Sequence, residues 1–216
     1  MNQSLLEQVL QIPDAFLFVE KLNASLQLEQ AKRKSFYEQV DENSKMEFIN
    51  GEIILNSPVM KRHNTATGFL YRLLSIYASK HNLGFVGIEK IMVSLTRNDY
   101  EPDLCFFGQA TAKNFQADQM RFPAPDLVVE VVSKSTEKID RSIKFEDYAA
   151  HKVSEYWIID PDKETLEQYL LEEESYQLNF KSNDGVVHCQ AVKGFDLPVK
   201  AIFNEQDNIL ALQNLL

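Results

Sequence analysis

Acidic residues stand at positions where this chain otherwise predicts buried β-structure. Glu130 interrupts the apolar run 127–132, whose valines are typical of a strand covered on both faces. A carboxylate inside such a run costs several kcal/mol unless it pairs with a cation or binds a metal ion. Glu130 therefore indicates either a buried ion pair, with Arg141 or Lys144 as partner, or a metal site.

Two further aspartates could join Glu130. Side chains alternate across a strand, so Asp126 shares a face with Glu130. If Asp103 lies on a neighbouring strand, Asp103 and Glu130 supply the hard oxygen ligands that Mg²⁺ or Mn²⁺ prefers. Each aspartate follows a proline, so a turn-capping role is the alternative for Asp103 and the expected role for Asp126.

A third group of residues follows the acidic strand. Asp140, Lys144 and Tyr148 recur at four-residue steps and so form one stripe of a helix expected over about residues 138–151. An ammonium at Lys144 could orient an attacking water or stabilise charge on a phosphate. The alternative is a simple ion pair between Asp140 and Lys144, which stabilises a helix by only ~0.2–0.5 kcal/mol.

Helical spacing of apolar residues identifies the helices that must position these groups. The first 35 residues predict helices interrupted at Pro13, to which we assign an accessory packing role. A core-facing helix is expected over about residues 63–80. His63 begins this helix, where a lone histidine is more often a surface or capping group than a base.

Strand signals fill most of the remaining chain. The Asn50-Gly51 pair predicts a tight hairpin turn, and Glu47 and Glu52 flank it at positions that we expect to face solvent. The acidic strand, its helix and an apolar strand near residues 156–159 form a strand–helix–strand unit, which indicates a mixed α/β fold. Other strands are expected at 85–95, 104–107, 166–171, 176–180 and 186–191.

Composition limits the classes of protein. The 216 residues are 44% hydrophobic, contain no apolar run of the ~20 residues that cross a bilayer, and predict a soluble cytoplasmic protein with no membrane partner. A formal net charge of −10 argues against a non-specific nucleic-acid coat but not against a local groove. Cys105 and Cys189 lack metal-binding spacing, and no GxSxG element supports a serine hydrolase.

An ordered set of motifs resembles the Uma-type family of putative restriction endonucleases. The resemblance covers roughly residues 40–205. The motifs are 45–52, Ser57-Pro58 with His63, 101–104, 125–136, the residues Asp140, Lys144 and Tyr148, and 155–161. This resemblance implies a PD-(D/E)xK nuclease: a mixed β-sheet flanked by helices, with a magnesium-dependent phosphodiesterase site. It also implies an N-terminal helical extension over 1–40, a restriction-endonuclease-like domain over 41–205 and a C-terminal tail over 206–216.

The resemblance assigns roles residue by residue. Asp103 matches the first metal-binding aspartate and Glu130 the acidic member of the (D/E)xK element. Val132 stands where the lysine of that element is usual, and Lys144 on the next helix matches the lysine that takes its place in this family. Lys152 departs from the glycine that relatives usually carry, which suits a left-handed conformation after a helix.

Two hypotheses of function follow from these residues. The first is a Mg²⁺- or Mn²⁺-dependent nuclease acting on DNA, with Asp103, Glu130 and Lys144 in the site and Glu47, Glu52 and His63 as secondary candidates. The second is a catalytically inactive nuclease fold that serves as an interaction or regulatory module. A homodimer is also expected, with the antiparallel strands near the C-terminus as a candidate interface.

Overall fold

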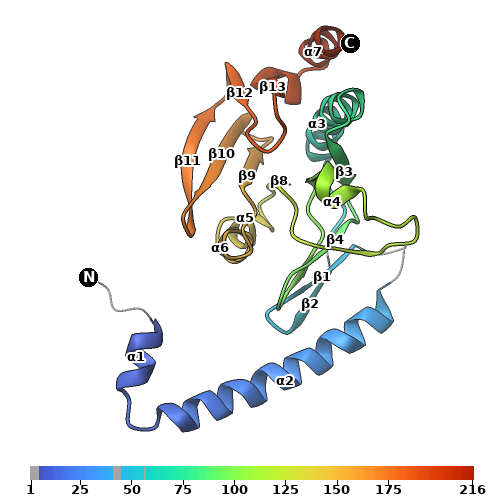
Figure 1. Cartoon of the computed structure of the whole chain (residues 1–216). Helices are drawn as coiled ribbons and strands as arrows, with labels where there is room; N and C mark the ends of the chain where they lie inside the picture. The colour runs from blue at the N-terminus through green and yellow to red at the C-terminus, as the bar shows by residue number, and fades with distance from the viewer. Residues whose placement is uncertain (1–4, 41–44, 56) are drawn as a thin grey trace.

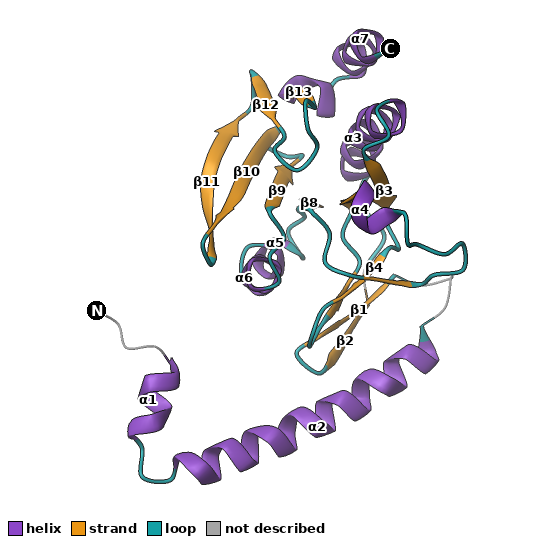
Figure 2. Cartoon of the chain, viewed as in Figure 1, coloured by secondary structure: helices purple, strands orange, loops and turns teal. Residues whose placement is uncertain are grey.

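A computed structural model describes residues 5–40, 45–55 and 57–216 as a mixed α/β fold (Figures 1 and 2). The expected fold class is therefore confirmed. The helices are α1 (Leu5–Gln11), α2 (Ala15–Gln39), α3 (Lys61–Lys80), α4 (Gln109–Ala112), α5 (Glu137–Asp140), α6 (Ile143–Ala150), the 3₁₀ helix η1 (Val199–Ile202) and α7 (Glu205–Leu215).

The strands form two larger sheets and one small one within the described residues. One sheet has the order β11-β10-β9-β8-β6-β3, the second β2-β1-β5-β4-β7, and the third pairs β12 with β13. The strands are β1 (Met46–Ile49), β2 (Glu52–Leu55), β3 (Gly84–Ile88), β4 (Met92–Ser94), β5 (Asp99–Tyr100), β6 (Leu104–Gly108), β7 (Arg121–Phe122), β8 (Leu127–Val131), β9 (Glu155–Asp160), β10 (Thr165–Glu172), β11 (Ser175–Ser182), β12 (Val186–His188) and β13 (Asp196–Pro198).

The strand–helix–strand unit is present as predicted. β8 and β9 pair in parallel and are joined through α5 and α6, whereas the other pairs of the six-stranded sheet are antiparallel. Alternating residues of β8 enter two different cores: Val129 packs with α3, and Val128 packs with Tyr148 of α6. The sheet is therefore covered by α3 on one face and by α6 on the other.

The prediction of a single helix over residues 138–151 is wrong in one respect. The helix is broken at Arg141 and Ser142, so Asp140 ends α5, whereas Lys144 and Tyr148 lie in α6. Tertiary contacts account for the break, because the Arg141 guanidinium donates to Glu167 of β10 at 2.7 and 3.0 Å. This half-buried pair fixes the α5–α6 junction against the sheet.

The end of α6 explains the departure at Lys152. Its backbone φ is +62°, in the left-handed region that favours glycine. The Val153 N–H donates to the Tyr148 carbonyl at 3.0 Å, and the Lys152 N–H donates to the Ala149 carbonyl at 3.0 Å. These two bonds form a Schellman cap, so the chain keeps the turn that glycine would favour, with lysine in its place.

The packing role expected for the N-terminal helices is largely wrong. α1 and α2 form on either side of Pro13, as predicted. However, α1 contains no buried residue, and in α2 the buried residue is Phe36. Phe36 packs with Phe48 of β1, with ring centroids 5.6 Å apart. Figure 1 shows α1 and the first half of α2 extending away from the sheets. Helical periodicity identified the helices but could not show what covers them.

Smaller differences lie in the other segments. The strand expected over 85–95 is divided between β3 and β4, which belong to different sheets, and the strand expected over 186–191 is the shorter β12, which pairs with β13. The hairpin turn is confirmed, since Asn50 and Gly51 both have positive φ values, +51° and +84°. Among the described residues, no helix is both long enough and apolar enough to span a membrane.

The Glu167 carboxylate gives a first testable prediction. Burial alone would raise its pKa, but hydrogen bonds from Arg141, Tyr169 and Lys181 lower the pKa to about 2. A depressed folded-state pKa contributes stability that is complete above the ordinary pKa of about 4.5 and is lost as the pH falls through about 2. We expect Glu167→Gln to lower the free energy of unfolding by about 1–3 kcal/mol at neutral pH.

Urea unfolding at neutral pH and near pH 3 checks this prediction. The deficit of Glu167→Gln should shrink at the lower pH, because the wild-type carboxylate is losing its advantage there. Glu172→Gln, an exposed residue of the same strand, is the matched control and should behave as wild type at both values. An equal deficit at both pH values would contradict the electrostatic explanation.

Candidate active site

Asp103 and Glu130 meet where two central strands pair. β6 and β8 are antiparallel, and Leu104 lies opposite Val129. One step beyond this pair, the register brings Asp103 opposite Glu130. The Val131 N–H donates to Asp103 Oδ2 at 2.8 Å, which ties the aspartate directly to the neighbouring strand.

The two carboxylates also share one face of the sheet. Cys105 and Val128 lie opposite each other and pack in the core beneath α6. Asp103 and Glu130 are each two residues away from these positions, so alternation along the strands directs both toward the same face. Both residues are buried, at 5% and 3% exposure. Two acids in one buried place require nearby cations.

Asp103 is held by two cationic partners. Its Oδ1 lies 3.1 Å from Lys45 Nζ, and its Oδ2 lies 3.3 Å from His63 Nε2. Burial favours the neutral acid, but the hydrogen bond from His63 and the charge of Lys45 keep the pKa of Asp103 well below its usual range. Lys45 Nζ also lies 3.2 Å from Glu89 Oε2, so it bridges two carboxylates.

His63 corrects the expectation of a surface or capping group. Although it belongs to the first turn of α3, it is buried and turned toward Asp103. Burial alone would lower its pKa, but the hydrogen bond and charge of Asp103 raise it above the usual value. Among the described residues, none makes a hydrogen bond with His63 Nδ1. His63 is therefore a partner of the Asp103 carboxylate.

Lys144 lies among three carboxylates. Its Nζ is 2.9 Å from Glu47 Oε1, 3.1 Å from Glu130 Oε1 and 3.3 Å from Asp140 Oδ1. The ion pair with Asp140 exists, but it is one of three contacts rather than an isolated surface pair. Burial disfavours the ammonium, yet the charges of Glu130, Glu47 and Asp140 raise the pKa of Lys144 well above its ordinary value. Lys144 therefore stays charged inside the protein.

Glu47 does not face solvent as expected. It is 3% exposed, points from β1 toward Lys144, and accepts the Glu101 N–H at 2.9 Å through Oε1. Its neighbour Phe48 faces α2 instead, since the two sides of β1 alternate. The five-stranded sheet thus contributes one carboxylate to a cluster that the six-stranded sheet, α5 and α6 complete.

Glu130 is the carboxylate with the least compensation. Burial raises its pKa well above the ordinary value, and the negative charges of Asp140, Asp103 and Glu47 act in the same direction. The Lys144 ammonium opposes them without outweighing them. A further cation near Glu130 would therefore be favourable.

Three candidates from the sequence lie apart from this cluster or play another part. Asp126 is at the opposite end of β8, roughly 13 Å along the strand from Glu130, and accepts the Gly108 N–H at 2.7 Å. Glu52 is exposed and pairs with Lys32 at 3.1 Å. Tyr148 is fully buried, and its ring packs 5.1 Å from the ring of Tyr100. Asp126 and Glu52 are therefore outside the cluster, and Tyr148 packs under it.

Sequence reasoning missed three charged residues of the cluster. Lys45 and Glu101 stand inside recognisable motifs, and their spacing beside Glu47 and Asp103 could have identified them. Glu101 accepts the Met46 N–H at 3.1 Å, and burial raises its pKa to about 7. Glu89 has no such signal: it follows β3 with φ +54°, and only the fold brings it to Lys45.

The donor set is compatible with a hard divalent cation bound by two carboxylates. No group of three or more His, Cys, Asp or Glu side chains in the described part of the chain is arranged to hold a metal ion. Mg²⁺ usually keeps several waters and takes one or two protein carboxylates together with substrate phosphate oxygens. Asp103 and Glu130 supply that number, and the burial of Glu130, which Lys144 compensates only in part, favours an added cation.

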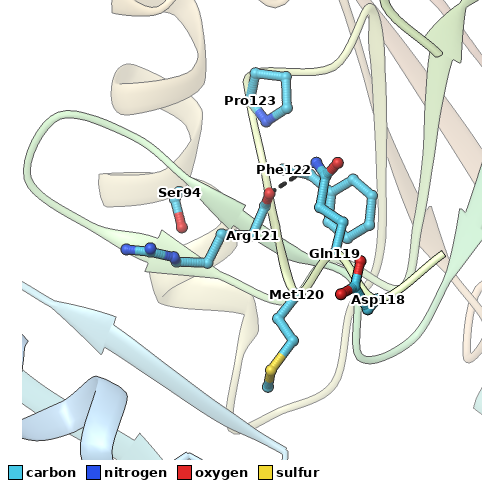
Figure 3. A pocket seen from close by; sticks show the side chains of 7 residues that line it. All are labelled: Ser94, Asp118, Gln119, Met120, Arg121, Phe122 and Pro123. Atoms are coloured by element: carbon cyan, nitrogen blue, oxygen red, sulfur yellow. Dashed lines mark hydrogen bonds between the residues drawn. The ribbon is translucent and has the colours of Figure 1, made fainter. Parts of the chain in front are cut away.

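A separate pocket of about 590 Å³ lies beside the five-stranded sheet (Figure 3). None of the candidate residues lines it. Gln119 Nε2 donates to the Arg121 carbonyl, two residues further along the chain, at 2.9 Å (Figure 3). The lining residues are Ser94, Asp118, Gln119, Met120, Arg121, Phe122 and Pro123. This pocket contains no cluster of acids and does not carry the candidate chemistry.

The fold and the paired acids define the class of protein. A mixed sheet flanked by helices, with carboxylates on adjacent strands and a lysine reaching them from the next helix, is the arrangement expected of a restriction-endonuclease-like fold. The chain matches the Uma2 family, described as "Putative restriction endonuclease", over residues 12–200. It belongs to that family.

Two known proteins are similar to this chain. An uncharacterized protein of Synechocystis sp., sll1609, is 31% identical over 127 residues, which are 58% of this chain and 71% of that protein. A crystal structure described as a putative nuclease belonging to DUF820, from Anabaena variabilis, superposes with a TM-score of 0.66 at 17% identity. The match covers 77% of this chain and 94% of that chain, and it supports the fold.

Proposed function

We propose that this protein is a divalent-metal-dependent nuclease that hydrolyses phosphodiester bonds in DNA. The observation that carries the proposal is the pairing of Asp103 and Glu130 on one face of adjacent strands, with Lys144 3.1 Å from Glu130 Oε1. Family membership and the likeness to a structure described as a nuclease support the same chemistry.

Each of the three residues has a distinct role in this proposal. Asp103 and Glu130 would hold Mg²⁺ or Mn²⁺, which when bound polarises the phosphate and lowers the pKa of water. Lys144 keeps its proton, because three carboxylates surround it, and so can orient the attacking water or stabilise negative charge on the phosphate. His63 and Lys45 hold Asp103 ionised and in position.

The substrate is expected to reach the site through local contacts rather than through a basic surface. A net charge of −10 predicts weak binding to bulk DNA at physiological salt. Cleavage should therefore depend on the metal ion and change little with added salt, because few phosphate contacts release few counterions. We also propose that the protein acts as a homodimer, because cutting both strands is simplest with two sites.

Cleavage of several DNA forms tests the proposal. We expect wild type to cleave supercoiled, linear or single-stranded DNA with Mg²⁺ or Mn²⁺, and to be inactive with EDTA. Asp103→Asn, which keeps the shape of the side chain, should lose about 10²–10³-fold of this rate. Glu52→Gln, an exposed acid on the neighbouring hairpin, is the control and should retain full activity.

The alternative is an inactive nuclease fold that serves as an interaction or regulatory module. Absence of metal-dependent cleavage on every DNA form, by protein that is folded, would favour that alternative. Equal cleavage by wild type and Asp103→Asn would show that the activity comes from a contaminant or from another site.

A further inference from the structure

The N-terminal arm, defined as residues 5–28, is apolar without being covered. Ten of its large apolar side chains are between 39% and 76% exposed, among them Leu5, Phe16 and Leu28. Figure 1 shows α1 and the first half of α2 reaching away from both sheets. An arm with this composition is expected to have a partner in solution.

One stripe of α2 shows what kind of partner is missing. In the second half of the helix this stripe meets the protein's own sheets through Arg33, which pairs with Asp99, and through the buried Phe36. The same stripe continues toward the N-terminus, at steps of three and four residues, through Leu22 and Val19. There it is apolar, 46% and 44% exposed, and lies beyond the sheets. The missing partner is therefore apolar too.

The exposed area is that of a protein interface. The ten side chains present on the order of 1,000 Å² of apolar surface, whereas the largest apolar patch on a typical monomer is about 300–600 Å². A standard stable interface buries about 800 Å² on each partner. Consecutive residues such as Leu17 and Phe18 point about 100° apart around α2, so one partner helix buries part of this area rather than all of it.

The charges of the arm and of the adjoining helix favour a second copy in antiparallel orientation. Acidic residues Glu7, Asp14 and Glu20 lie toward the N-terminal end, and the exposed Lys34 lies where α2 reaches the sheets, beside Lys32 and Arg33, which pair with Glu52 and Asp99 of the same chain. Antiparallel pairing places the acidic end of one arm toward Lys34 of the other, whereas parallel pairing opposes like charges. A two-fold contact of this kind also closes, which leaves no arm unpaired.

We infer that two copies of this chain dimerise through their N-terminal arms, with the α2 helices antiparallel across a two-fold axis near Val19 and Leu22. This surface differs from the C-terminal strands that the sequence suggested. It rests on the homodimer proposed above but not on the nuclease chemistry, so loss of cleavage would leave the dimer standing.

Light scattering on the full chain tests the inference. We expect wild type at twice the chain mass, and Phe16→Glu/Leu22→Glu as a monomer with a dimer dissociation constant raised at least about 100-fold. Both side chains are exposed, so the melting temperature of the sheets should be preserved. Leu178→Glu, 52% exposed on the edge strand β11, is the control and should remain dimeric.

Three results of the light-scattering experiment would overturn the inference. They are a monomeric wild type, an arm variant that stays dimeric, and dissociation by Leu178→Glu alone. A monomer that sediments with phosphatidylcholine–phosphatidylglycerol vesicles would assign the arm to a membrane surface and would likewise overturn dimerisation.

Engineered cysteines test the orientation of the arms. Val19→Cys lies near the proposed axis and should form an intermolecular disulfide, whereas Lys34→Cys lies about 20 Å further along α2 and should not. The native Cys105 and Cys189 are buried, so they should not interfere. Cross-linking at both positions would indicate parallel pairing, and cross-linking at neither would exclude the contact.

Discussion

Lys144→Met is expected to lower the free energy of unfolding by about 3–5 kcal/mol, the cost of leaving a buried charge without its partner. The ammonium lies within 3.3 Å of carboxylate oxygens from Glu47, Glu130 and Asp140. Lys144 and these three acids are each at most 4% exposed. Methionine fills a similar volume, so the loss should come from charge rather than from a cavity.

The pH dependence of this variant follows from the same contacts. Burial already raises the pKa of Glu130 and of Asp140, so the folded state binds more protons than the unfolded chain. Stability from such groups falls as the pH rises through the folded pKa. Without Lys144 the effect should grow, and the deficit of Lys144→Met should shrink as the pH is lowered from 8 toward 5.

Urea unfolding across this pH range measures both effects. Lys138→Met, an exposed lysine on α5, is the matched control and should change the free energy of unfolding by less than about 0.5 kcal/mol. If Lys144→Met were as stable as wild type at every pH, the three carboxylates would have to be neutral in the native protein. That result would remove the reason for assigning Lys144 a permanent charge.

Patterns confined to one element were predictable from the sequence. The valine run around Glu130 predicts a buried strand, and the Asn50-Gly51 pair predicts the hairpin; both are present. The burial cost of Glu130 also required a nearby cation, and Lys144 is there at 3.1 Å. These inferences succeed because they depend on local geometry and on the cost of one buried charge.

Features that depend on two distant elements were not predictable. Glu47 and Glu52 flank the same turn and, because Ile49 pairs with Glu52, lie on one face of the hairpin. Glu47 is buried against Lys144, whereas Glu52 is exposed beside the turn, because only the tertiary packing decides how much of that face is covered. The bridge from Lys45 to Glu89 and the break at Arg141 have the same origin. The periodicity of apolar residues predicts whether a segment is a helix or a strand, but not which other element packs against it.

These contacts give Glu130 a particular place in the proposed chemistry. Asp103 is fully compensated by Lys45, His63 and the Val131 N–H, whereas Glu130 shares the single ammonium of Lys144 with two other acids. A divalent cation would therefore gain more from Glu130 than from Asp103 in electrostatic terms. Removal of the Glu130 charge should accordingly be the more damaging of the two substitutions.

Glu130→Gln is expected to lower metal-dependent DNA cleavage by at least about 10³-fold, since several kcal/mol of charge stabilisation would be lost with the ion. The same variant should fold normally and gain stability without metal, because glutamine removes a buried charge whose pKa burial has raised. Wild type should melt at a higher temperature as Mn²⁺ is added, and this increase should vanish in Glu130→Gln but persist in Glu52→Gln. Should Mn²⁺ stabilise Glu130→Gln as much as wild type, the ion would bind elsewhere, and Glu130 would be a structural partner of Lys144 alone.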